Sequence, residues 1–303
     1  MTLPNPNSRI PNCSSYHGRF APSPTGPLHF GSLVAAVGSW ARARSQNGTW
    51  IIRMEDLDPP REVPGAAADI IATLAAFGME SDEPVLYQST RIAVYAEVFE
   101  QLQQAGHVFP CWCSRSDLAA MHGLHSGTCA AAPDPARAPA WRLRAPDCVV
   151  AFDDLACGPQ AQNLRDVAGD FVIRRVEGWY AYQLAVVVDD AQQGVSEVVR
   201  GADLLDSTPR QIYLQQVLGL PTPAYLHLPL VLDADGHKLS KTDRARPVER
   251  RNPLPALRAA LEFLGIDARG GARVDTLLRR AAAQFDPTRL PKSATALPDV
   301  GTY

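Results

Sequence analysis

Lysine is scarce in this chain of 303 residues, although cationic side chains as a whole are not. Only three of the 29 Lys and Arg residues are lysines, namely Lys238, Lys241 and Lys292. By composition alone, two given cationic positions would both hold lysine with a chance of roughly 1%, yet Lys238 and Lys241 fall within one four-residue stretch. This bias indicates that the stretch needs compact ammonium groups rather than planar guanidinium groups.

Long apolar runs and an excess of basic charge are also lacking. No run approaches the ~20 apolar residues that span a bilayer. The net charge of -3 argues against a generally basic nucleic-acid binder, although local basic faces stay possible. The first residues are rich in Pro, Asn and Ser and have no hydrophobic segment, so they are not a secretory signal. We expect a disordered tail over residues 1–17 and a cytoplasmic protein.

The apolar content of 46% is enough for a globular core, and the first third of the chain alternates strands with helices. A strand ends near Ala21, and Thr49–Met54 is a short β-branched run that predicts a buried strand. Helices are predicted over residues 31–45, 63–77 and 90–105. This alternation predicts an α/β fold with a parallel sheet, whose ligands bind beyond the carboxyl ends of the strands.

The rest of the chain divides by composition. Residues 109–170 hold most of the cysteines and a loose Ala/Pro segment, which indicates an inserted subdomain between residues 18–108 and 171–246. Residues 247–303 predict a short, mostly helical C-terminal segment. The apolar run 180–190 fits a central strand or part of a buried helix equally well. We further predict strands at 171–175, 197–201 and 226–232, and helices at 208–218, 254–264 and 274–285.

The stretch Gly18–Ser32 runs from a strand end through a Pro/Gly loop into a helix N-terminus. The first backbone N–H groups of a helix lack internal partners, and the helix dipole is positive at that end. Such a turn can hold a phosphate group. The alternative is a tight strand-to-helix turn that binds nothing.

Four residues of the insertion have metal-ligand spacing. Cys111, Cys113, His125 and Cys129 form the pattern C-x-C-x11-H-x3-C, which supplies three sulfurs and one nitrogen. Zinc takes that ligand set in closed structural sites. His122 is a competing imidazole, and the alternative is a set of buried free cysteines. The pattern assigns no role to the other cysteines, which are Cys13, Cys148 and Cys157.

Two short motifs then suggest a family. The stretch His29–Ser32 resembles the HIGH motif of class I aminoacyl-tRNA synthetases, and Lys238–Thr242 resembles their KMSKS motif. The stretches that resemble the glutamyl branch of this class are Arg19–Gly26, Arg53–Asp58, Ala185–Asp190 and Val199–Gly201. The resemblance runs from Gly18 to Arg246 and implies a Rossmann-type catalytic domain with an inserted zinc-bearing subdomain.

The resemblance also implies roles for individual residues in ATP-dependent activation of L-glutamate. His29, Ser32, Lys238 and Lys241 would act in catalysis, and ATP would bind at His29, Gly31, Ser32 and Lys241 together with Mg²⁺. Glutamate would bind at Arg19, Ala21, Ser23, Glu55, Tyr182 and Arg200. Arg19 would pair the side-chain carboxylate as a bidentate fork with help from Arg200 and Tyr182, and Glu55 with Ser23 would take the α-ammonium.

Relatives in this branch often carry tyrosine where His125 stands, so the histidine is a departure. It makes chemical sense, because a neutral imidazole is a better zinc ligand than a phenol. We therefore expect one structural zinc ion per chain.

The segment after Lys241 is short. About sixty residues follow it, fewer than the helical anticodon-binding domain of a full-length glutamyl-tRNA synthetase needs. This layout is similar to that of the glutamyl-queuosine tRNA(Asp) synthetase family. The likeness implies a monomer that transfers glutamate to the queuosine base at the wobble position of tRNA(Asp). The alternatives are a truncated glutamyl-tRNA synthetase-like ligase with another acceptor, and a non-catalytic RNA-binding or regulatory paralogue.

Overall fold

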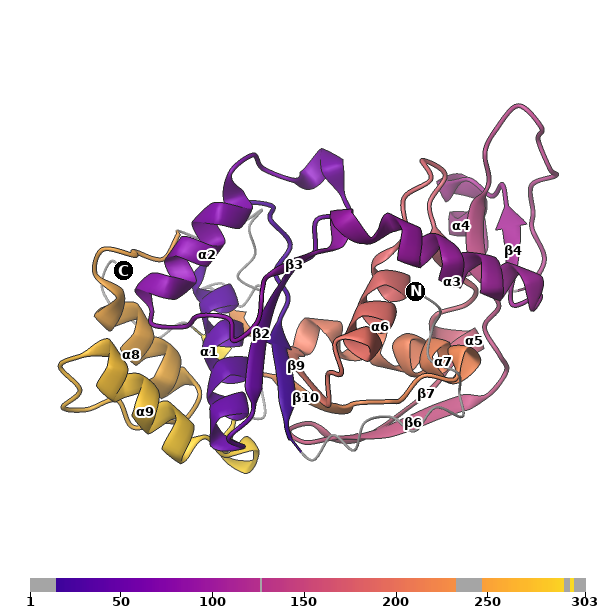
Figure 1. Cartoon of the computed structure of the whole chain (residues 1–303). Coiled ribbons are helices and arrows are strands. Elements are labelled where there is room, and N and C mark those ends of the chain that lie inside the picture. Colours follow the sequence, from indigo (N-terminus) through magenta and orange to yellow (C-terminus); the bar gives the residue numbers. More distant parts are fainter. Residues whose placement is uncertain (1–14, 126, 233–246, 292–294, 297–303) are drawn as a thin grey trace.

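The centre of the molecule is a parallel sheet in two parts. The computed structural model describes residues 15–125, 127–232, 247–291 and 295–296 (Figure 1). One part pairs β1 (His17–Phe20) with β2 (Thr49–Met54), and β2 with β3 (Leu86–Tyr87). The other part pairs β9 (Glu197–Gly201) with β10 (Ala224–Leu228).

The two parts meet at β1 and β9. The backbone N–H of Ser196 donates to the carbonyl of His17 over 2.9 Å, which places the start of β9 beside β1. The chain leaves β1 toward β2 and β3 and later returns on the opposite side of β1 to form β9 and β10. The strand order therefore reverses between β1 and β9, which is the place where open α/β sheets bind their ligands.

Helices cover both sides of this sheet (Figure 1). On one side lie α1 (Phe30–Ser45), α2 (Ala66–Ala76), α8 (Pro253–Phe263) and α9 (Val274–Gln284). On the other lie α6 (Tyr182–Gln192) and α7 (Thr208–Leu218), and α3 (Ile92–Gln104) packs on α6 and on the inserted region.

The contact between α1 and the sheet is close. A Cβ added at Gly38 would lie 2.5 Å from Leu228 Cδ1, so the helix approaches β10 only because this position is glycine.

The inserted region has a sheet of its own. The strands β4 (Val108–Cys111), β5 (Ala140–Leu143) and β8 (Phe171–Arg174) pair antiparallel. We predicted that residues 171–175 return to the central domain, but β8 pairs with β5 and so completes the sheet of the insertion. Conversely, β6 (Val149–Asp154) and β7 (Gly158–Asn163) form a hairpin that joins the central sheet beside β10.

The remaining elements are short. These are α4 (Arg115–Ala120), α5 (Leu164–Val167), β11 (Val231–Leu232), β12 (Thr295–Ala296) and the 3-10 helices η1 (Pro59–Arg61), η2 (Gln88–Arg91), η3 (Ala202–Ser207) and η5 (Pro287–Arg289). Among the described residues, no helix has both the length and the apolar character needed to cross a membrane.

Two ambiguities of the sequence are settled by the fold. Most of the apolar run 180–190 lies in the helix α6, which begins at Tyr182, and the residues from Gln183 to Asp190 are all buried. A helix that is buried all round shows no 3.6-residue period, which is why its sequence also fits a strand. The expected tail ends earlier than predicted, because β1 begins at His17 and the hydroxyl of Tyr16 donates to Glu197 over 3.1 Å.

Candidate active site and metal centre

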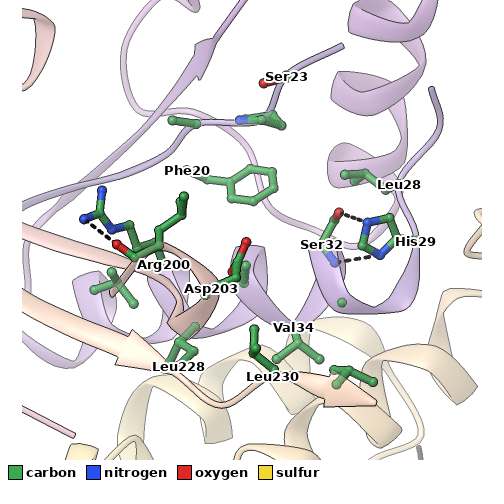
Figure 2. A pocket seen from close by; sticks show the side chains of 18 of the residues that line it. Phe20, Ser23, Leu28, His29, Ser32, Val34, Arg200, Asp203, Leu228 and Leu230 are labelled. Carbon is green, nitrogen blue, oxygen red and sulfur yellow. Dashed lines mark hydrogen bonds between the residues drawn. The ribbon is translucent and has the colours of Figure 1, made fainter. Parts of the chain in front are cut away.

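A cavity of about 410 Å³ opens where β1 and β9 end, beside the N-terminus of α1. Figure 2 shows His29 and Ser32 on one side of this cavity and Arg200 on the other. All described residues that we predicted to bind glutamate or ATP line the cavity, namely Arg19, Ala21, Ser23, His29, Gly31, Ser32, Glu55, Tyr182 and Arg200. The predicted Lys238 and Lys241 lie outside the described residues.

His29 caps the helix α1. Its Nδ1 accepts a hydrogen bond from the backbone N–H of Ser32 over 3.3 Å, and its Nε2 lies 3.0 Å from Ser32 Oγ. Both residues face the cavity where the first turn of α1 leaves its N–H groups without helical partners. The chain returns to this place at Pro247, which forms a β-bridge with His29. The two predicted residues therefore form one unit at a positive helix end, a place suited to phosphate.

Arg200 is a buried cation that has no acidic hydrogen-bond partner among the described residues. Its side chain is 5% exposed at the end of β9, and its partners are all neutral. Asp203 also lines the cavity. The five hydrogen bonds from Arg200 go to His227 Nε2 (3.1 Å), Tyr182 Oη (3.2 Å), Gln211 Oε1 (2.8 Å), Leu204 O (3.3 Å) and Thr208 Oγ1 (2.8 Å).

Arg19, in contrast, is already neutralised. Its Nε and Nη2 donate to the two carboxylate oxygens of Asp190 over 3.1 and 3.3 Å, and both side chains are buried. We predicted that this edge of Arg19 would hold a substrate carboxylate, but Asp190 occupies it. Of the two arginines that line the cavity, Arg200 is therefore the one without a carboxylate partner among the described residues.

Asp190 also connects Arg19 on β1 to Arg53 on β2. Arg53 Nη1 lies 2.8 Å from Asp190 Oδ1, and Arg53 Nη2 lies 3.4 Å from Glu55 Oε1. Burial would raise the pKa of Asp190, but Arg19 and Arg53 outweigh it and hold that pKa below its usual value. Burial raises the pKa of Glu55, because Arg53 and Arg19 offset only part of the desolvation.

Burial likewise raises the pKa of Tyr182, so its side chain is a neutral phenol at pH 7. Because Tyr182 Oη accepts from Arg200, its own O–H is left to donate elsewhere. Ser23, Glu55 and Tyr182 also line an adjoining cavity of about 190 Å³, so the three residues stand between two hollows.

The four predicted zinc ligands come together in the insertion. One donor atom from each of Cys111, Cys113, His125 and Cys129 lies within 4.8 Å of the others. Cys111 ends β4, and the turn through α4 brings the chain back so that His125 and Cys129 reach Cys111 and Cys113. The competing His122 is not a member of this cluster and occupies a turn with a φ of 55°.

The imidazole of His125 is held with one nitrogen available. Its Nδ1 lies 2.8 Å from Asp170 Oδ2, and its buried Nε2 has no hydrogen-bond partner. The backbone N–H of Asp170 donates to the His125 carbonyl over 2.6 Å, and Gly169 is so close that a Cβ there would lie 2.5 Å from that oxygen. A carboxylate behind a histidine ligand is typical of metal sites, and three sulfurs with one imidazole suit zinc.

Comparisons with known proteins agree with this geometry. The family model described as "tRNA synthetases class I (E and Q), catalytic domain" matches residues 15–138 and 136–253. A glutamyl-Q tRNA(Asp) synthetase from Burkholderia cenocepacia is 57% identical over 89% of this chain and 95% of its own length. One from Xanthomonas campestris is 54% identical over 92% of this chain and 95% of its own. The chain belongs to the glutamyl-Q tRNA(Asp) synthetase family.

A solved structure supports the same fold for this family member. A glutamate tRNA ligase from Elizabethkingia meningosepticum, crystallised in complex with its amino acid, superposes with a TM-score of 0.79 at 22% identity. The match covers 94% of this chain and 67% of that ligase. The predicted class I synthetase fold is thereby confirmed.

The sequence analysis of this glutamyl-Q synthetase assigned no role to Asp189 and Asp190. It used them only as the end of a stretch that resembles the glutamyl branch, where they follow a buried apolar run. Asp189 is 0% exposed and accepts from Gln88, Arg91 and Tyr95, so it ties α6 to the segment before α3. Asp190 ties α6 to β1 and β2. The two carboxylates thus fix α6, and Tyr182 on its first turn, against the sheet.

Proposed function

We propose that this chain activates L-glutamate with ATP and transfers the glutamyl group to the queuosine base at the wobble position of tRNA(Asp). The observation that carries the proposal is the buried guanidinium of Arg200, whose hydrogen-bond partners are neutral, in the same cavity as the carboxylate of Glu55 and at the reversal of strand order. The names of relatives that are more than half identical support the choice of acceptor.

The charges of the cavity match glutamate. Asp190 pairs with Arg19 and Arg53, and Glu55 also pairs with Arg53, whereas the hydrogen-bond partners of Arg200 are neutral. Free glutamate has two carboxylates and one ammonium group, so it can bring an anion to Arg200 and a cation to Glu55. Buried charges are stable only when they are paired, so glutamate would complete this cluster.

Each charge of glutamate then has a partner. Arg200, with the hydroxyl of Tyr182, binds the side-chain carboxylate, because the longest hydrogen bonds of this guanidinium are the ones to Tyr182 and Leu204 on the cavity wall. Glu55 and Ser23 bind the α-ammonium. Arg19 and Ala21 complete the pocket wall, and Arg19 acts through the charge that it shares with Asp190.

The phosphates of ATP lie at the other end of the cavity, against His29, Gly31 and Ser32. The α-carboxylate of glutamate attacks the α-phosphorus, a bond to that carboxylate oxygen forms, and the bond to the β-phosphate bridging oxygen breaks. Pyrophosphate leaves with the electron pair. Positioning and charge stabilisation do most of this work. Lys238 and Lys241 would stabilise the leaving group, and Mg²⁺ would accompany ATP.

Zinc would be held by Cys111, Cys113, His125 and Cys129 and would have a structural role. Four protein ligands leave no coordination position for a water molecule or substrate, and closed sites of this kind stabilise folds rather than perform chemistry. The ion would fix the turn between β4 and β5, in which the described residues form only the six-residue helix α4.

A charging assay tests the acceptor. We expect radiolabelled glutamate to be transferred to tRNA(Asp) that carries queuosine, and not to queuosine-free tRNA(Asp) or tRNA(Glu). The Lys241→Ala variant is the inactive control and should lose pyrophosphate exchange by about 100-fold or more. Label on tRNA(Glu) would favour a glutamyl-tRNA synthetase-like ligase. If the Lys241→Ala variant keeps the wild-type rate of pyrophosphate exchange, this result would argue against the adenylation chemistry.

The KM for glutamate is expected to rise on acidification, because protonated Glu55 cannot bind an ammonium group. The raised pKa of Glu55 moves this loss to a higher pH than for an ordinary glutamate, and KM should rise about tenfold for each pH unit below that pKa. The KM for glutamate is measured by pyrophosphate exchange at saturating ATP between pH 7.5 and 4.5. A KM that stays flat down to the ordinary range of about 4.3 would contradict the role of Glu55.

A further inference from the structure

A buried chain of three side chains stands behind the proposed carboxylate site. Asp154 at the end of β6 lies with its Oδ2 2.6 Å from His227 Nδ1. On the other side of the imidazole, His227 Nε2 accepts from Arg200 Nε over 3.1 Å. His227 is 1% exposed and Asp154 is 3% exposed, so the chain runs entirely through the interior. None of these contacts arises from neighbouring residues in the sequence.

The hydrogen bonds determine which nitrogen of His227 carries the proton. Arg200 can only donate, so Nε2 must present a lone pair. The single proton of the neutral ring is then on Nδ1, where it is donated to Asp154. Burial lowers the pKa of His227, and the Arg200 charge acts in the same direction, while Asp154 opposes both. The ring therefore stays neutral and remains an acceptor.

The surroundings leave the ring no other arrangement. Tyr225 on β10 stacks on the imidazole at 6.2 Å with an interplanar angle of 11°. Thr208 Oγ1 on α7 lies 3.3 Å from Nε2. The Oδ1 of Asp154 accepts from the backbone N–H groups of Ala156 and Cys157 over 3.0 and 2.8 Å, which fixes the carboxylate in turn. The charged groups that act on the ring are Asp154, Arg200 and, at longer range, Arg19.

We infer that His227, oriented by Asp154, is a positioning residue that sets the direction of the Arg200 guanidinium toward the carboxylate of glutamate. The bond to Nε fixes the plane of the guanidinium, and this directs Nη1 to Tyr182 and Nη2 to Leu204, two residues that line the cavity. Neither His227 nor Asp154 lines the cavity, so both act through Arg200. The inference rests on the proposed function, because it assumes that Arg200 binds glutamate.

Two substitutions of His227 separate positioning from structure. His227→Gln places an amide oxygen near the position of Nε2 and keeps an acceptor for Arg200. His227→Asn places its amide near the position of Nδ1, so it keeps a partner for Asp154 and loses the acceptor. We expect the KM for glutamate to rise about 10-fold or more in H227N and less than about 3-fold in H227Q, with the KM for ATP unchanged in both.

The isosteric variant Asp154→Asn provides a second route if H227N does not fold. Its Oδ1 can keep both backbone hydrogen bonds, while its amide group donates to Nδ1 and forces the proton onto Nε2, against Arg200. We expect a rise in the glutamate KM like that of H227N. A purely structural role predicts the reverse order. The glutamate KM of H227N, which keeps the Asp154 contact, would then be closer to the wild-type value than the KM of H227Q.

The outcomes are distinguishable from failure of the proposed function. Pyrophosphate exchange and calorimetric binding of L-glutamate are measured on the full chain. If the wild type shows no glutamate-dependent exchange, the proposed function and this inference both fail. If the wild type is active and both H227N and D154N retain its glutamate KM, the inference alone is overturned.

Discussion

Arg200→Ala is expected to raise the KM for glutamate by about 100- to 1000-fold while leaving the KM for ATP nearly unchanged. Removing one partner of a buried ion pair costs about 3–5 kcal/mol, because the remaining charge is left desolvated and unpaired. In this variant the unpaired charge is the substrate carboxylate. Pyrophosphate exchange at varied glutamate concentration, with calorimetry as a second measurement, gives the affinity.

Two further arginine variants act as controls for this result. Arg200→Lys keeps the charge but cannot reach five acceptors in one plane, so an intermediate KM is expected. Arg44→Ala removes an arginine that pairs with Asp82 at the surface, where ion pairs contribute little, and should behave like the wild type. Unchanged glutamate affinity in the Arg200→Ala variant would remove this residue from the site.

Loss of the metal cluster is expected to have the second large effect. The wild-type chain should hold one zinc ion, and Cys113→Ser should hold well under one and unfold at a lower temperature. Structural zinc contributes apparent free energies of about 10–16 kcal/mol in small zinc domains, so its loss should unfold the turn between β4 and β5 at least locally. Metal analysis by mass spectrometry and a thermal melt measure both effects.

Cys157→Ser is the matched control for the metal prediction. Cys157 is an exposed thiol in the turn between β6 and β7 and is not a member of the cluster, so its removal should change neither the zinc content nor the melting temperature. Equal zinc content in the Cys113→Ser and Cys157→Ser variants, or a wild type without zinc, would reject the site.

The features that could be predicted are those whose chemistry is contained in short stretches. The cap of α1 depends on His29 and Ser32, which are three residues apart, so the strand–loop–helix pattern was enough to place it. The cluster ligands lie between positions 111 and 129, and their spacing already pointed to one ion. The strand Thr49–Met54 was also predicted correctly, because a short β-branched run has few other solutions.

The features that were not predicted depend on residues far apart in the chain. Nothing near Arg19 indicates that Asp190, 171 residues later, takes the edge expected for the substrate. The strand β8 pairs within the insertion although its sequence fits either sheet equally well.

By itself, the sequence determined the family and the chemistry of the two local motifs, because caps and closely spaced ligands act over a few residues. It also determined which residues line the cavity, through short stretches that resemble one branch of synthetases. Only the tertiary structure decided which of the two arginines in the cavity pairs with a buried carboxylate. Arg19 and Arg200 look alike in sequence, and their difference comes from the buried groups that surround each one: a carboxylate beside Arg19, and five neutral acceptors around Arg200.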